Sequence, residues 1–319
     1  MITSDKKDYN YITFPRQFTA YRWYKPLLVG LLTFVFFILF SVALTVIGFI
    51  ISDAGDFTSF YYYYLESSEV EYTVPGMFMT LGYVAIMLPA LAVAVRIIYD
   101  RPFSSYSSSR GGWKWKTFLK CLAVSGIISG AAFVIQLLMP SDGSETAGMN
   151  VAADVLVITI IMVPFQCAAE EYIFRGYIMQ AVGGWTKLPV IAIIVETIVF
   201  TLGHEYNLIG LAAIFVSGLT YGIIAWKSNG LEATSASHIV NNLLAFILPV
   251  LGLAESGTDA GVLDLVISVI IDVIYLTLML IIIRKTNWFA PKQDGNPAEE
   301  FNIKKAARQA AKNKKAVAE

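Results

Sequence analysis

Long apolar stretches separated by short polar segments dominate the chain. Eight of them are long enough to cross a membrane as helices, since a span needs roughly 17 to 25 residues. They lie at about 26–51, 77–97, 117–139, 151–182, 188–206, 208–226, 231–250 and 265–283. This pattern predicts an all-α, polytopic integral membrane protein with about eight transmembrane helices.

Composition strengthens this prediction. Hydrophobic residues make up 56% of the 319 positions and charged residues only 15%, against about 25% charged residues in soluble domains. The first span is too long for a signal-peptide core and has no small-residue cleavage site behind it, so we expect it to be retained. The expected organisation is a cytoplasmic N-terminal segment (1–25), a transmembrane domain (26–285) and a basic cytoplasmic tail (286–319).

Basic residues indicate the orientation of the bundle. If eight spans alternate, both termini fall on one side, and all 23 Lys and Arg residues fall there with them. Acidic residues occupy the opposite loops, including Asp53, Asp56 and Glu71. Basic residues are retained on the cytoplasmic side near helix ends. We therefore expect cytoplasmic termini, in a bacterial plasma membrane.

The net charge of −1 gives no reason to expect a nucleic-acid partner. The basic tail KKAARQAAKNKK is expected to be a solvated, disordered segment that could also touch anionic lipid. The partners that remain are the lipid bilayer and a membrane-associated peptide or protein.

Ionisable residues inside the predicted spans are few, and each is a functional hypothesis because its burial in a membrane is costly. They are Asp154, Glu170, Glu171, Arg175, Glu196, His204, Glu205, His238 and Asp272. The list includes both histidines of the chain. The sequence assigns no role to Asp154, Glu196 or Asp272.

The spacing of these residues predicts that several meet. Glu170 and His204 are equidistant from residue 187, which lies in the turn GGWTKLP between two predicted helices. In an antiparallel hairpin the two side chains should therefore face each other. Residues four apart share a helical face, which pairs Glu171 with Arg175, Phe200 with His204, and His238 with Asn242.

These groups permit amide hydrolysis. A carboxylate in a partly dry site can accept a proton from water, and His238 with Asn242 could donate hydrogen bonds to a developing oxyanion. Two histidines and a carboxylate are also a catalytic zinc set. The sequence therefore allows two alternatives: a Zn²⁺ ion held by His204, His238 and Glu170, or a metal-independent reaction. The HExxH pattern of zincins is absent.

Three motifs then carry a resemblance. They resemble, in order, the motifs of the CPBP intramembrane protease family, which comprises CAAX prenyl endopeptidases and bacterial Abi proteins. The motifs are EEYIFR (Glu170, Glu171, Arg175), FTLGH (Phe200, His204) and HIVNN (His238, Asn242). The resemblance covers about 160–245, within an expected protease core at about 150–250.

The resemblance implies a CAAX-protease-like helical core and an intramembrane endopeptidase. In that reading Glu170 and His204 activate water, His238 and Asn242 stabilise the oxyanion, and Glu171 with Arg175 positions the helix or the substrate. Two alternatives stay open: a transporter or channel using buried Glu and His residues as an ion relay, and a non-catalytic bacteriocin-immunity protein. The sequence does not identify the substrate, its cleavage site or the oligomeric state.

Overall fold

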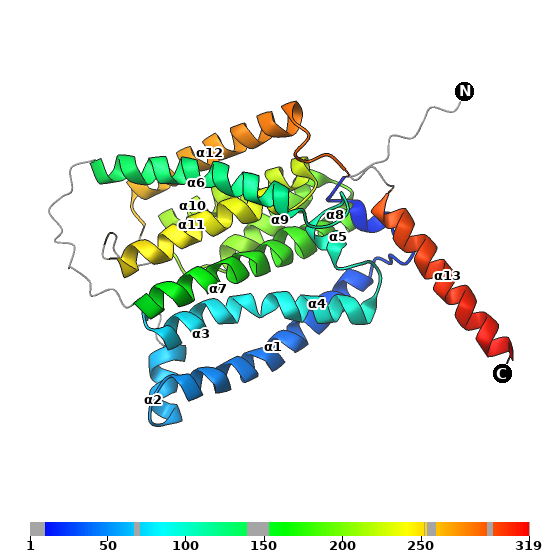
Figure 1. Ribbon diagram of the computed structural model, residues 1–319, viewed down its shortest axis with the longest axis horizontal. Coiled ribbons are helices and arrows are strands. Elements are labelled where there is room, and N and C mark those ends of the chain that lie inside the picture. The colour runs from blue at the N-terminus through cyan, green and yellow to red at the C-terminus, as the bar shows by residue number, and fades with distance from the viewer. Residues whose placement is uncertain are drawn as a thin grey trace.

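The computed structural model describes residues 10–66, 71–138, 153–251, 253, 260–291 and 296–318, and helices form most of these (Figure 1). Parts of the predicted segments, including residues 1–9 and 139–152, lie outside the described residues. The α-helices are α1 (Lys25–Ile51), α2 (Phe57–Tyr61), α3 (Val74–Ala85), α4 (Met87–Ile98), α5 (Ser104–Ser107), α6 (Trp115–Leu138), α7 (Ala153–Glu171), α8 (Met179–Thr186), α9 (Pro189–Leu202), α10 (Leu208–Ser228), α11 (Glu232–Val250), α12 (Val262–Lys285) and α13 (Pro297–Ala318). A 3₁₀-helix, η1 (Phe14–Gln17), and two π-helices, η2 (Tyr62–Glu66) and η3 (Tyr172–Ile178), complete the set.

Seven helical segments among the described residues are long and apolar enough to cross a membrane. They are α1, α3 with α4, α6, the continuous run α7–η3–α8, α10, α11 and α12. The all-α polytopic membrane fold is thus confirmed, although the count of about eight spans was approximate. The eighth predicted span is the shorter helix α9, which has only 14 residues.

The prediction of a helix over 188–206 is wrong at its C-terminal end. Helix α9 ends at Leu202, its C-cap is Gly203, and the chain then runs without helical structure to Asn207. The Asn207 side chain accepts a hydrogen bond from the backbone N–H of Gly210 at 2.8 Å and so caps the start of α10. His204 therefore lies on the short connection between α9 and α10 and not within a helix.

Helix α11 lies inside the bundle. It packs against α6 and α7 and also contacts α10, while α10 packs against α9 and α12 (Figure 1). The first half of α11 is almost fully buried, from Glu232 to Ile239. Glu232 forms an ion pair of 2.5 Å with Arg110, whose side chain is also buried. This pair holds the start of α11 against the segment between α5 and α6.

The segment that starts at Asn10 and the first turns of α13 pack together at one end of the bundle (Figure 1). Tyr11 and Ile12 are fully buried, and Phe18 contacts Phe301 of α13 at a ring-centroid distance of 5.5 Å. The Asn302 side chain accepts a hydrogen bond from the backbone N–H of Thr19 at 2.9 Å. The expected disordered tail is therefore wrong for the described residues, because an Ala- and Lys-rich sequence favours helix and the start of α13 packs against the N-terminal segment.

Candidate active site

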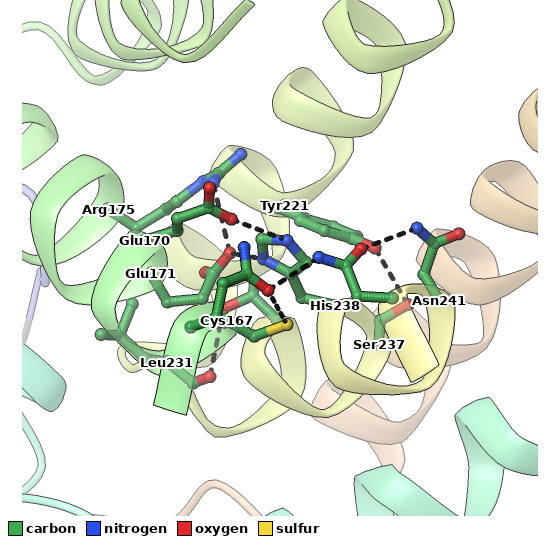
Figure 2. Close-up of polar contacts among 12 residues, drawn as sticks. Cys167, Glu170, Glu171, Arg175, Tyr221, Leu231, Ser237, His238 and Asn241 are labelled. Atoms are coloured by element: carbon green, nitrogen blue, oxygen red, sulfur yellow. Dashed lines mark hydrogen bonds and ion pairs between the residues drawn. The ribbon is translucent and has the colours of Figure 1, made fainter. Parts of the chain in front are cut away.

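His238 lies between two carboxylates (Figure 2). Its Nδ1 is 3.0 Å from Oε1 of Glu171, and its Nε2 is 3.1 Å from Oε2 of Glu170. All three residues are buried. The two glutamates are adjacent at the end of α7, and α11 packs against α7, so helix packing brings the first and third sequence motifs together.

A second set of buried ion pairs extends from Glu171. Its Oε1 is 3.2 Å from NH1 of Arg175, the pairing that the four-residue spacing predicted. Nε of Arg175 lies 3.3 Å from Oε1 of Glu196 on α9, and the guanidinium stands 4.3 Å from the centroid of the Phe200 ring. Arg175 belongs to the π-helix η3, a wide turn of a kind found often at functional sites.

Glu196 belongs to this network, although the sequence assigned it no role. Two features pointed to it: Glu196 is the sole charged residue of α9, and it lies one turn before Phe200 on the same face. Its side chain is fully buried. With Glu170 and Glu171 it makes three carboxylates around one guanidinium and one imidazole.

His204 reaches the same region from the connection after α9. Its Nδ1 is 2.8 Å from the backbone carbonyl oxygen of Phe200. Because a carbonyl oxygen only accepts, Nδ1 must carry the proton, and Nε2 of the neutral ring is then an acceptor. The Phe200 ring contacts both histidine rings, at 4.7 Å from His204 and 6.1 Å from His238.

The hairpin geometry predicted that Glu170 and His204 face each other. The structure brings both to the surroundings of Phe200, but the ion-pair partner of Glu170 among the described residues is His238. The difference follows from the end of α9 at Leu202. His204 lies beyond that end, and its ring nitrogen Nδ1 contacts the backbone carbonyl oxygen of Phe200 at 2.8 Å.

Asn242, the last motif residue, takes part in a row of amides. Its Nδ2 donates to Oε1 of Gln166 on α7 at 3.0 Å, and its Oδ1 accepts from Nδ2 of Asn241 at 3.1 Å. Gln166 lies one turn before Glu170 on α7. The sequence analysis missed Gln166, which was visible as a polar side chain one turn from the motif. Cys167 donates to the same Oε1 at 3.2 Å.

The zinc site suggested by the sequence stays a prediction, and the placement of its residues bears on how a metal ion could bind. Among the described residues, no group of three or more His, Cys, Asp or Glu side chains could hold a metal ion. Both ring nitrogens of His238 already have carboxylate partners. A metal ion could bind this ring only by displacing one of them.

The remaining ionisable residues of the predicted spans lie elsewhere. Asp154 is exposed at the start of α7, where its Oδ1 accepts from the backbone N–H of Val155. Glu205 is exposed beside His204. Asp272 of α12 is buried and accepts a hydrogen bond of 2.6 Å from the Ser217 hydroxyl of α10.

The arrangement suits acid–base chemistry at a carbonyl group. It groups a buried carboxylate and the buried His238 imidazole with two half-buried groups, the His204 imidazole and the Asn242 amide. Such a cluster inside an apolar bundle is the kind of site expected of a membrane-embedded hydrolase.

Comparison with known proteins agrees with this class. Residues 152–244 match the family model described as type II CAAX prenyl endopeptidase Rce1-like. The resemblance to the CPBP and CAAX protease family is thereby confirmed for this part of the chain, which contains all three motifs.

One curated relative is uncharacterized protein YyaK of Bacillus subtilis (strain 168), which is 26% identical over 166 residues. The alignment covers 49% of this chain and 55% of the relative, so the chain spans about half the length of the curated protein that it matches. No solved structure matches the chain.

Proposed function

We propose that the chain is an intramembrane endopeptidase that hydrolyses a peptide bond of a membrane-associated protein or peptide. The position of His238 carries this proposal, because its two ring nitrogens face the carboxylates of Glu170 and Glu171 inside an apolar bundle. The match of residues 152–244 to an endopeptidase family supports a proteolytic role for the cluster.

Glu170 is the proposed general base. Its Oε2 lies at ion-pair distance from His238 but has no hydrogen bond of good geometry among the described residues. This oxygen is buried, so a water molecule that enters the cluster with the substrate can bind to it without displacing an aligned bond. Glu170 takes a proton from that water as its oxygen attacks the substrate carbonyl carbon, while Nε2 of His204 accepts a hydrogen bond from the same water and orients it.

His238 and Asn242 are the proposed donors to the oxyanion. As the substrate enters, its carbonyl oxygen takes the place of Glu170 at the Nε2–H of His238, and the amide of Asn242 turns from Gln166 to join it. The tetrahedral intermediate then collapses. The C–N bond breaks, and Glu170 returns its proton to the leaving amine nitrogen.

Glu171 and Arg175 are proposed to position these groups. Glu171 holds Nδ1 of His238 at 3.0 Å, which fixes the ring orientation. Arg175 in turn neutralises Glu171 and Glu196 at 3.2 and 3.3 Å. The proposed reaction passes through these side chains, and no step requires a metal ion.

Glu170 lies near the middle of the 34-residue segment Ala153–Thr186, which is long enough to cross the membrane. A peptide bond must therefore reach membrane depth to be cleaved, which suits a membrane-associated substrate. Both ends of the chain lie at one end of the bundle and carry many of the basic residues (Figure 1). This supports cytoplasmic termini.

The test is peptide cleavage by the purified protein in liposomes. Comparative proteomics of membrane fractions with wild type and with Glu170→Ala would first name candidate substrates. Wild type should then cleave them, and Glu170→Gln should lose roughly 10²- to 10⁴-fold in rate, the usual contribution of a general base. Glu299→Gln, the same change at an exposed residue of α13, is the matched control and should keep full activity.

Full cleavage by Glu170→Gln would overturn the assignment. Ion flux through liposomes that depends on Glu170, without any cleavage, would favour the transporter. A protein that neither cleaves nor transports would point to the non-catalytic alternative.

A further inference from the structure

Helix α12 carries a polar stripe that the proposed reaction does not use. Asp264, Ser268 and Asp272 follow one another at four-residue spacing in an otherwise strongly apolar helix, so they lie on one face. The stripe starts in the first turn of α12, at the end of the helix remote from α13 (Figure 1).

Two neighbouring helices present matching polar pairs at the same spacing. Ser217 and Tyr221 lie on one face of α10, and Ser237 and Asn241 lie on one face of α11. The Ser217 hydroxyl donates to Asp272 at 2.6 Å, and the Tyr221 hydroxyl donates to Ser237 at 3.4 Å. Three helices therefore turn polar faces toward one place inside an apolar bundle.

A cavity of about 170 Å³ fills that place. Its polar lining comes from Ser129 of α6 and from the three polar faces just described, except Ser217. Ile267 and Ile271 of α12 supply apolar lining. A water molecule occupies about 30 Å³ in the liquid, so the cavity has room for several. The described lining contains two carboxylates and no basic side chain, and intramembrane carboxylates almost always face a partner or a water-filled space.

The cavity lies directly behind the catalytic histidine. The Tyr221 hydroxyl lines the cavity, while the Tyr221 ring packs against the His238 ring at 5.8 Å. In Figure 2, Ser237 and Asn241 lie beyond His238, on the side away from Glu170. Asn241, which lines the cavity, donates to Asn242, and Asn242 donates to Gln166 beside Glu170.

We propose that this cavity is a second binding site, whose ligand is water, and that it supplies the hydrolytic water to the His238 face of α11. The water enters at Asp264, at the end of α12 remote from α13, and passes Ser268 to Asp272. The row of amides from Asn241 to Gln166 then provides successive hydrogen-bond partners on the way to Glu170. The supply role rests on the proposed peptidase function, whereas the presence of water does not.

The presence of water is tested by cysteine labelling of the full chain in liposomes. The two natural cysteines, Cys121 and Cys167, are first replaced by alanine. A charged methanethiosulfonate should then label Ser268→Cys on the cavity face. It should not label the matched control Ile270→Cys, because Ile270 lies on the outer face of the same helix, is 51% exposed and is expected to face lipid. An unlabelled Ser268→Cys in a protein whose exposed Glu299→Cys is labelled would overturn the proposal.

The supply role is tested by filling the cavity. Ser268→Leu should remove the labelling of Asn241→Cys and lower kcat with little change in KM, because substrate does not bind in the cavity. Ile270→Leu, a substitution on the exposed face of the same helix and outside the cavity lining, should keep kcat and KM unchanged. Should Ser268→Leu fail to fold, Ser129→Val narrows the cavity from α6 and serves the same purpose.

An unchanged kcat in a variant that has lost labelling would overturn the supply role. If no form of the protein cleaves any peptide, the peptidase proposal fails and the supply role fails with it. Labelling of Ser268→Cys still decides in that case whether the cavity binds water.

Discussion

Nε of Arg175 lies 3.3 Å from Oε1 of Glu196, and both side chains are fully buried. This contact joins the π-helix after α7 to α9, so it fixes the segment that carries Phe200 relative to the segment that carries Glu170. It also means that the charged cluster extends beyond the three sequence motifs.

Removal of Glu196 should destabilise the protein. Glu196→Ala leaves the guanidinium of Arg175 with one carboxylate fewer in a buried place, and breaking a buried ion pair costs about 3 to 5 kcal/mol. We expect a lower thermal unfolding temperature in detergent. Glu196→Gln keeps a hydrogen-bond acceptor and should lower the unfolding temperature less. Equal unfolding temperatures for wild type, Glu196→Ala and Glu196→Gln would contradict a structural role for this contact.

His204 should be required for cleavage and dispensable for folding. The ring is only half-buried, and its contact at 2.8 Å is to the backbone of its own segment, at Phe200. We expect His204→Ala to lose cleavage by roughly 10²-fold or more with an unchanged unfolding temperature. Substitution of the exposed neighbour, Glu205→Gln, is the control, and it should leave the rate unchanged.

The ion pair between Arg110 and Glu232 should stabilise the protein by holding α11 in place. Both side chains are buried, and the pair holds the first turn of the helix that carries His238. Arg110→Ala should therefore lower the stability by about 3 to 5 kcal/mol because Glu232 is left buried and unpaired. The double variant Arg110→Met, Glu232→Leu removes both charges and should recover much of that loss. A double variant no more stable than Arg110→Ala would contradict this account.

Chelation should not stop the reaction. Both ring nitrogens of His238 face carboxylates, so this one of the three proposed zinc ligands is already paired. We expect purified, active protein to contain far less than one zinc per chain and to keep its cleavage rate in EDTA. Stoichiometric zinc that is lost together with activity, and restored together with it, would show that the cluster rearranges around a metal.

The sequence predicted the membrane fold well because apolar length alone identifies spans of about 20 residues. It also predicted the pairing of Glu171 with Arg175, which depends only on local helical spacing. Helix ends were harder to predict. Hydropathy continued past Leu202, whereas the C-cap at Gly203 and the cap of α10 by Asn207 depend on local backbone geometry.

Contacts between helices distant in sequence were the least predictable part of the site. Hairpin spacing relates α7 to α9, but the position of His238 between Glu170 and Glu171 depends on how α11 packs between α6 and α7. The same reason explains why Gln166 was missed. Its partner, Asn242, is 76 residues away in the chain, and local spacing carries no information on such a pair.

The wide turn η3 makes the number of residues in this segment as important as their identity. Tyr172–Ile178 contains the extra residue of a π-helix, and the chain then continues as α8, whose buried Gln180 contacts Arg101. An α-helix rotates by about 100° per residue, so deletion of one residue here would turn α8 by that angle relative to Glu170 and Glu171. A single deletion between Arg175 and Met179 should consequently be more damaging than any one side-chain replacement there, and homologous chains that share the site should keep the length of this segment.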